Sequence, residues 1–404
     1  MTRRLPLAAA LSAAWAAAAW FLWHTSVVPS SLRLPQVDEH RFFTAAQIHA
    51  ASSFSSVEDV LFWGTTLAQI AALVVFARWG GRWARESAAG PVGTGMLLGM
   101  LGFALVWAAQ LPLSVVDLWW QRRHGISHVG YASFLFGDWF ALGGEFVFLC
   151  VALAIVMGLA RRFKQAWWAL AAPVFVGLAL LFAFVGPYLL GTQRLDEPGL
   201  ARIAAGLEKK EHVGHVLVVV EPIHDVTSLP NAEATGLGPS RRVALFDTLL
   251  DGRFTTGELK VVIAHELGHL ARHHIWKDVG WYALFAFPGT FLLSLVARRR
   301  GGMGEAAAIP LALLALVVLQ LLALPLQNAI SRHMEAEADW MALRTTHDPR
   351  DMVRLMQRFV PTTLEEPDPS TLDYLMEENH PTIVQRIAMA EAWKRYATSA
   401  AQSP

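Results

Sequence analysis

Charged side chains are scarce in this chain of 404 residues. Asp, Glu, Lys and Arg together make up 16% of it, whereas hydrophobic residues make up 54%. Soluble domains carry about 25% charged residues. The deficit of charge, together with sixteen tryptophans, argues against a soluble domain and predicts an integral membrane protein.

Cysteine is nearly absent, since Cys150 is the only one in the sequence. A single thiol excludes an internal disulfide and any metal site that needs several cysteine ligands. The formal net charge is zero, so no excess of basic residues points to nucleic acid as a partner.

Seven runs of apolar residues are each close to the roughly 20 residues that a membrane-spanning helix needs. They cover residues 5–23, 57–77, 95–118, 139–159, 167–190, 279–296 and 306–326. Tryptophans cluster near the ends of several runs, as they do at membrane surfaces. Two arginines before the first run also fit a signal peptide, but the length of the run favours a spanning helix. The sequence therefore predicts about seven transmembrane helices.

A polar segment between the fifth and sixth runs contains the motif His265-Glu266-Leu267-Gly268-His269. Residues four apart lie on one face of a helix, so the two imidazoles can bind one Zn²⁺. Glu266 is placed to act as general base on a water molecule without being a ligand itself. Thr255 and Glu258 fit a capping box, which favours a helix that begins there. The alternative is a chance match on a polar helix, and a third ligand would decide between the two.

We expect the third ligand downstream, where Glu335 and Asp339 lie four apart on one face of a predicted helix. Glu335 would complete a set of two histidines and one carboxylate and leave a fourth position for water. Asp339 would accept the free N–H of a ligating histidine and fix its tautomer. Glu337 would point to another face, so we expect it to be a surface charge.

Two histidines that follow the motif closely, His273 and His274, are alternative ligands. We expect them instead to be exposed to solvent, or to contact a metal ligand without binding the metal themselves. A third histidine at the spacing typical of metzincins is excluded, because Ile275 occupies that position. Glu335 therefore stays the preferred third ligand.

The motif and the segment 331–339, which contains Glu335 and Asp339, together resemble the membrane-bound gluzincin metallopeptidases. These include the type I CAAX prenyl proteases and the HtpX-type proteases. Three further segments resemble the prenyl protease branch. They are 230–238, with Pro230 in place of the usual serine, 242–250 before the motif, and 379–387 near the C-terminus. The resemblance is strong over about residues 195–390 and weaker before them.

The resemblance implies a mainly α-helical membrane protein. About seven transmembrane helices would surround a water-filled chamber, and a gluzincin-type α+β zinc peptidase domain would close one side of it. His380 would donate a hydrogen bond to the oxyanion or lie beside the zinc site, and Arg386 would anchor the same element to a carboxylate. Asn231 would hydrogen-bond an extended substrate beside a sheet edge. For His380 and Asn231, a plain turn residue is the alternative.

These observations divide the chain into five parts. Residues 1–193 form an N-terminal membrane domain with five transmembrane helices, and 194–277 form the first part of the zinc peptidase domain. Residues 278–327 add two transmembrane helices, 328–396 form the second part of the peptidase domain, and 397–404 are a tail. Within the peptidase domain, we expect short strands at 216–220 and 243–250.

The sequence and the resemblance predict a metalloendopeptidase with one Zn²⁺ per chain. Its substrate would be a peptide or protein that is membrane-associated or lipid-modified. Membrane lipids would surround the enzyme itself. The composition suggests a bacterium and hence the inner membrane, where a quality-control role of the HtpX type is the alternative. A site-2 type protease would bury its motif in a spanning helix, but here Lys260 and Arg272 flank the motif. A catalytically silent membrane scaffold is a further alternative, but it would not need Glu266.

Basic residues in the short loops favour an N-terminus in the cytoplasm. With seven spans, this arrangement places the zinc domain outside the cytoplasm. The eukaryotic prenyl proteases that the chain resembles present theirs to the cytosol. The orientation therefore stays open at this point, as does the oligomeric state.

Overall fold

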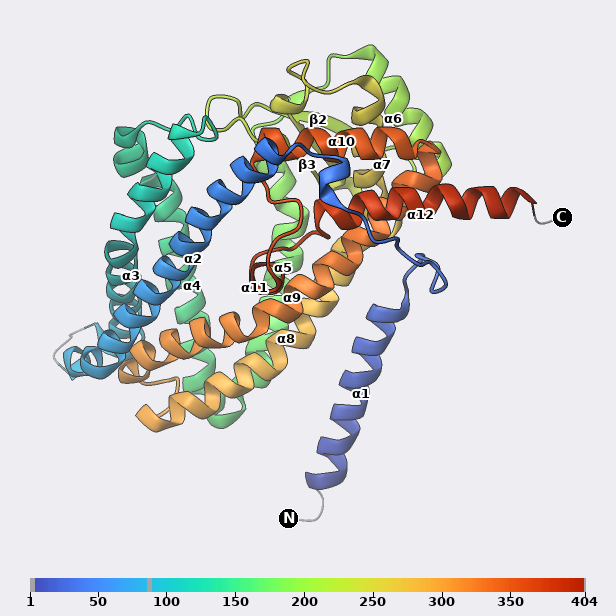
Figure 1. Cartoon of the computed structure of the whole chain (residues 1–404). Helices are drawn as coiled ribbons and strands as arrows, with labels where there is room; N and C mark the ends of the chain where they lie inside the picture. The colour runs from blue at the N-terminus through green and yellow to red at the C-terminus, as the bar shows by residue number, and fades with distance from the viewer. Residues whose placement is uncertain (1–3, 86–88, 138, 403–404) are drawn as a thin grey trace. The chain divides into compact units, whose positions relative to one another are not determined.

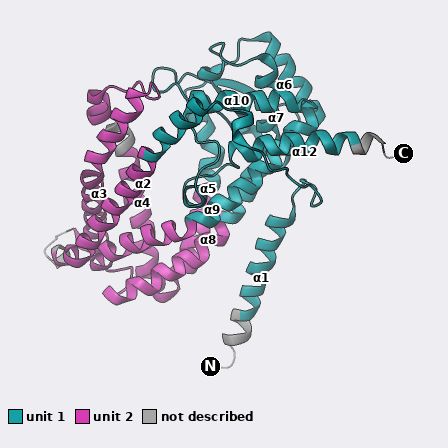
Figure 2. Cartoon of the chain, viewed as in Figure 1, with its two compact units in different colours: residues 1–56, 180–281, 324–404 teal, residues 57–179, 282–323 magenta. Residues whose placement is uncertain are grey.

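The computed structural model describes residues 4–85, 89–137 and 139–402 of the chain. Long helices make up most of it, with one small β-sheet (Figure 1). The chain divides into two compact units (Figure 2). Unit 1 comprises residues 1–56, 180–281 and 324–404, and unit 2 comprises residues 57–179 and 282–323. Each unit is therefore assembled from segments that lie far apart in the sequence.

Unit 1 contains a four-stranded sheet with the strand order β1-β2-β4-β3. β1 (Gln193–Arg194) pairs antiparallel with β2 (Leu217–Glu221), and β2 pairs in parallel with β4 (Arg242–Phe246). β3 (Ala232–Thr235) pairs antiparallel with β4. Within the described part of the chain no other strand pairs with β3, so one edge of β3 is free.

The structure confirms a strand near each of the two expected positions. β4 is shorter than expected, because the chain turns into a 3-10 helix at Asp247–Leu249 directly after Phe246. Asp247 Oδ1 accepts the backbone N–H groups of Ile223 and His224 at 3.0 Å each, which ties the end of β4 to the turn after β2. The sequence does not predict β1 or β3.

The helix with the His-Glu-x-x-His motif, α7 (Thr256–Ala271), begins with the expected capping box. The Thr255 N–H donates to Glu258 Oε2 at 2.7 Å, and the Glu258 N–H donates to Thr255 Oγ1 at 3.3 Å. Arg358 of α10 (Pro349–Thr363) donates to both carboxylate oxygens of Glu258 at 3.1 Å. The buried Glu258 therefore fixes the start of α7 and joins it to α10.

Apolar side chains on several faces of α7 pack into the hydrophobic core of unit 1. Val261, Ile263, Ala264 and Leu267 are each at most 2% exposed. α6 (Pro198–Glu211), α10 and β3 pack against the same helix. A helix that is apolar around most of its circumference is covered on most sides, so the motif lies within the packed core of unit 1.

Further helices contribute to unit 1, some of them only in part. α1 (Arg4–His24), α11 (Thr371–Met376) and α12 (Ile383–Gln402) belong to it entirely, and α9 (Ile309–Thr346) belongs to it from residue 324. α9 carries both the last apolar run and the predicted third ligand on one continuous helix. The boundary expected after residue 327 falls inside α9, and the one after residue 277 falls inside α8 (His274–Ala297). The division into five parts stays a prediction.

Unit 2 contains α3 (Gly90–Arg123) and α4 (Trp139–Phe163), most of α2 (Ala45–Trp79), much of α5 (Trp167–Leu189), the C-terminal part of α8 and the N-terminal part of α9. Its own core includes Phe76, Leu98, Leu153, Met157 and Ile309, all buried. Many other apolar side chains of these helices are exposed. Exposed apolar faces of this extent are typical of helices that contact lipid.

Five helical segments of the described chain are long and apolar enough to cross a membrane. They are 45–82, 90–123, 143–189, 274–300 and 306–346, and the third of them contains most of α4 and all of α5. α1 carries the first apolar run of the sequence. The chain is therefore an integral membrane protein built mainly from helices, whereas the number seven and the chamber stay predictions.

Candidate active site

His265, His269 and Glu335 lie together in unit 1, and their possible ligand atoms are all within 4.8 Å of one another. His265 Nε2 lies 3.1 Å from His269 Nε2 and 3.0 Å from Glu335 Oε2. His269 Nε2 lies 3.5 Å from Glu335 Oε1. Nitrogen and oxygen ligands of a tetrahedral Zn²⁺ are about 3.3–3.6 Å apart, given bonds of about 2.0–2.2 Å. The three side chains therefore fit a metal dication.

A close approach of α7 and α9 brings these side chains together. Gly268 of α7 faces α9, where an added Cβ would lie 3.0 Å from Met341 Cβ and 3.4 Å from the Cα of Ala338. Ala338 is fully buried. Because Gly268 and Ala338 are small, the helices come close enough for Glu335 to reach the two imidazoles one turn apart on α7.

The three residues border a cavity of about 320 Å³. Glu266 lines the same cavity and is 8% exposed. It is not part of the cluster of possible metal ligands. Its carboxylate is therefore available to take or give a proton beside that cluster, as the sequence predicts for a general base.

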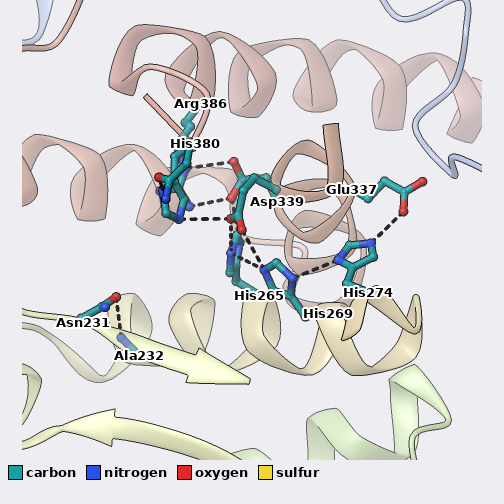
Figure 3. A network of polar contacts seen from close by, with 11 residues as sticks. Asn231, Ala232, His265, His269, His274, Glu337, Asp339, His380 and Arg386 are labelled. Atoms are coloured by element: carbon teal, nitrogen blue, oxygen red, sulfur yellow. Dashed lines mark hydrogen bonds and ion pairs between the residues drawn. The ribbon is translucent and has the colours of Figure 1, made fainter. Parts of the chain in front are cut away.

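A charged pair holds His265 from outside the cluster (Figure 3). Asp339 Oδ1 lies 2.9 Å from His265 Nδ1, and Arg386 of α12 donates to both Asp339 oxygens at 2.9 and 2.7 Å. If Nδ1–H donates to Asp339, the lone pair of Nε2 faces Glu335 and His269. Burial lowers the pKa of His265, but Asp339 and Glu335 outweigh it and raise the pKa to about 10. A metal that binds Nε2 must displace this proton.

A different chain of contacts holds His269. His269 Nδ1 lies 2.9 Å from His274 Nδ1, and His274 Nε2 lies 2.8 Å from Glu337 Oε2. Lys277 donates to the same oxygen at 2.7 Å. Figure 3 shows His269, His274 and Glu337 in succession, on the side of the cluster away from Arg386. The order of partners requires His269 to donate from Nδ1 and His274 to donate from Nε2.

The expectation that Glu337 is a surface charge is wrong. Its side chain is 0% exposed, because Lys277, His274 and Arg272 surround it. Glu337 does lie on a different face of α9 from Glu335, but Lys277 and His274 of α8 cover that face. His273 is exposed, whereas His274 is buried. The backbone of His273 is left-handed, with a φ of 56°, and this turn starts α8 in a direction that returns His274 to His269. A pair of histidines directly after the motif is the one sign of this arrangement in the sequence.

His380 also lies at the ligand cluster, in the turn before α12. Its Nε2 is 3.4 Å from Glu335 Oε2, and its Nδ1 is 2.6 Å from Asn379 Oδ1. Packing against the cleft wall lowers the pKa of His380, although the Glu335 carboxylate opposes the shift. The side chain is 48% exposed towards the cavity, which it lines. His380 can therefore reach both the cluster and a molecule in the cavity.

Asn231 lies just before β3 and apart from the histidines (Figure 3). Its side-chain Oδ1 accepts the backbone N–H of Ala232 at 2.9 Å, and its backbone carbonyl accepts the N–H of Phe246 at 2.9 Å. Asn231 lines the cavity together with Ala232, Glu233 and Ala234. The free edge of β3 therefore borders the same cavity as the ligand cluster.

Comparisons with known proteins agree with this geometry. Residues 191–394 match the family model described as peptidase family M48. The uncharacterized metalloprotease YhfN of Bacillus subtilis is 24% identical over 395 residues, which cover 92% of each chain. The protease HtpX homolog of Acidiphilium cryptum is 33% identical over 181 residues, or 39% of this chain and 62% of that protein.

Among solved structures, the crystal structure of S. mikatae Ste24p matches 94% of this chain and 96% of its own. The TM-score is 0.74 and the sequence identity is 18%. At this identity, the likeness shows a common fold.

Proposed function

The chain belongs to peptidase family M48, and on that premise we propose that His265, His269 and Glu335 hold one catalytic Zn²⁺. The chain is a membrane-embedded metallopeptidase that acts on peptide or protein substrates. Two imidazoles and one carboxylate form a donor set that suits zinc and leaves a position open for water or substrate. The distances of 3.0, 3.1 and 3.5 Å between the possible ligand atoms support this assignment most directly.

When bound, zinc would acidify water and polarise the scissile carbonyl. Glu266 takes the proton of the attacking water and later passes it to the leaving amine. His380, at the cavity wall, donates a hydrogen bond to the oxygen that becomes negative as the carbonyl is attacked. Asp339 and Arg386 keep His265 in the tautomer that ligation requires, and His274 does the same for His269.

The substrate is bound as an extended chain along the free edge of β3. Backbone hydrogen bonds to a sheet edge bind peptides of varied sequence, and β3 is the strand that borders both Glu266 and the ligand cluster. Asn231, at the start of this edge, adds a side-chain contact to the substrate backbone. The resemblance to prenyl proteases favours substrates that are membrane-associated or lipid-modified.

A quality-control protease of the HtpX type is a second candidate function. The 33% identity to an HtpX homolog favours it, since the match includes a large part of that protein. The bacterial relatives also support a location in a bacterial inner membrane. A catalytically silent scaffold is disfavoured, because Glu266 lines the cavity although it is not one of the possible metal ligands. A scaffold would have no use for a carboxylate at this position.

The test of the proposed activity is Glu266→Gln in the full chain, purified in detergent. We expect about one zinc per chain by plasma mass spectrometry in both proteins, and a loss of about 10²–10⁴-fold in cleavage of quenched fluorescent peptides. The control is Glu197→Gln, which changes an exposed carboxylate at the start of α6. Equal cleavage by Glu266→Gln and the wild type would remove Glu266 from the mechanism.

Substrate class is tested with one peptide in two forms, with and without a farnesyl group on cysteine. Faster cleavage of the lipidated form supports the prenyl protease assignment. Equal cleavage of both forms, with unfolded membrane proteins accumulating in cells that carry Glu266→Gln, supports the quality-control alternative.

A further inference from the structure

A second cavity, of about 170 Å³, lies in unit 1 beyond the C-terminal end of β3. Leu237, Leu270, Ile275 and Trp276 provide its apolar walls. Leu237 and Leu270 are 6% and 4% exposed and form its base, whereas Trp276 is 55% exposed at its mouth. Arg241 and His273 contribute the polar part of the wall. The proposed chemistry at the metal uses none of the four apolar side chains.

The loop that forms one side of this cavity is held in a single shape. Gly236 has a φ of 91°, and a Cβ at this position would collide with the carbonyl of Ser240. The Leu237 N–H donates to Ser240 Oγ at 2.9 Å, and Ser240 is fully buried. The position of Leu237 is therefore set before any ligand arrives, as in a preformed binding pocket.

The second cavity continues the first along β3. Residues 231–234 line the cavity at the ligand cluster, and 236–238 line the second cavity. His269 lines both. A chain that lies along the free edge of β3 thus passes from the metal ligands to the mouth of the apolar cavity within a few residues.

We propose that this cavity is a specificity pocket for a large apolar side chain of the substrate, such as Leu, Phe or Met. The proposal rests on the proposed peptidase function. Antiparallel pairing is the more stable way to extend a sheet edge, and it places the N-terminal part of the substrate at the C-terminal end of β3. With a rise of about 3.3 Å per residue, the side chain that enters the pocket comes about two to four residues before the scissile bond.

The apolar base of the pocket determines which side chains it favours. Burying a Leu or Phe side chain against Leu237 and Leu270 replaces its contact with water, whereas Gly gains nothing and Asp loses its hydration. Discrimination of this kind amounts to about 10- to 100-fold in kcat/KM. Arg241 at the rim would instead favour an acidic side chain. An apolar preference and an acidic preference can therefore be distinguished by experiment.

The test uses a library of quenched fluorescent decapeptides, varied at one position at a time, with the full-length enzyme in detergent. We expect the wild type to favour Leu, Phe or Met over Gly by about tenfold or more at a position two to four residues before the cleaved bond. Trp276→Ala removes the exposed wall, and Ile275→Trp fills the cavity. Both should reduce this preference several-fold.

The matched control is Trp20→Ala, which removes an exposed tryptophan on α1 far in sequence from either cavity. Thermal unfolding of all three variants checks that they fold. Equal cleavage of Gly and Phe peptides by the wild type would overturn the pocket and leave the peptidase intact. So would a preference for Asp or Glu, or one located after the cleaved bond. Failure to cleave any peptide with zinc bound would overturn the proposed function and the pocket with it.

Discussion

Two histidines on the same helix are supported in different ways. His265 donates directly to Asp339, whose charge is matched by the two hydrogen bonds from Arg386. His269 reaches its carboxylate, Glu337, only through the ring of His274. The first arrangement puts a full negative charge against the imidazole, whereas the second passes orientation through an intermediate ring. We call Asp339 with Arg386 the direct arm, and His274 with Glu337 the relayed arm. The direct arm should contribute more to metal affinity than the relayed arm, although both fix the same tautomer.

The largest effect is expected for Glu335, which contacts both His265 and His269. Glu335→Ala removes the carboxylate that lies against both imidazoles, so zinc content should fall from about one per chain to near zero and activity should fall at least about 10³-fold. Glu335→Gln keeps the size of the side chain and separates the loss of charge from the loss of packing. Full zinc content in Glu335→Ala would place the third ligand elsewhere.

The direct arm should give the next largest effect. Asp339→Asn keeps a hydrogen bond to His265 but leaves Arg386, whose side chain is only 11% exposed, without its charge partner. We expect metal affinity to fall about 10- to 100-fold, and the free energy of unfolding to fall by about 3 kcal/mol. Competition with a fluorescent zinc chelator measures the first quantity, and chemical denaturation of the metal-free protein measures the second. An unchanged affinity would show that Asp339 only stabilises the fold.

The relayed arm should be weaker. His274→Phe fills the same buried space but offers no acceptor to His269 Nδ1, so affinity should fall by about tenfold, at the low end of such effects. His273→Phe, at the exposed neighbouring position, is the matched control. The comparison of the two arms would be reversed if His274→Phe lowered affinity more than Asp339→Asn did.

Metal affinity should also depend on pH, and over half a pH unit this change is the smallest of those expected. In the metal-free protein His265 has a pKa of about 10, so it is protonated at neutral pH and a metal must displace that proton. Affinity should therefore rise about tenfold per pH unit below about pH 10, or about threefold over half a unit near neutrality. Asp339→Asn removes the charge that raises this pKa, so its affinity should level off at a lower pH. Identical pH profiles of metal affinity for the two proteins would contradict the claim that Asp339 raises the pKa of His265.

The sequence could predict those features of the site that depend on local patterns along a single helix. The spacing of His265 and His269, the capping box at Thr255, and the step of four from Glu335 to Asp339 are local patterns on helices. Helix geometry alone places residues four apart on one face, and the structure has both pairs on helices and the capping box at the start of α7. Apolar runs of sufficient length likewise predicted most of the membrane-spanning helices.

Features that depend on tertiary packing were missed. Glu337 is buried because α8 brings Lys277 and His274 over it, and nothing within its own helix shows that. β3 has the sequence Ala-Glu-Ala-Thr, which has little strand propensity of its own. It forms because β4 provides a partner, and the free edge that borders the cavity follows from that pairing.

The central claim is that α7 and α9 together hold one metal ion through three side chains. Crystals of the wild-type chain grown with zinc, measured on both sides of the zinc absorption edge, test it directly. We predict one anomalous peak per chain, about 2.0–2.2 Å from Nε2 of His265, Nε2 of His269 and a carboxylate oxygen of Glu335. A peak on other residues, or one that leaves Glu335 more than about 3 Å from the zinc, would contradict it.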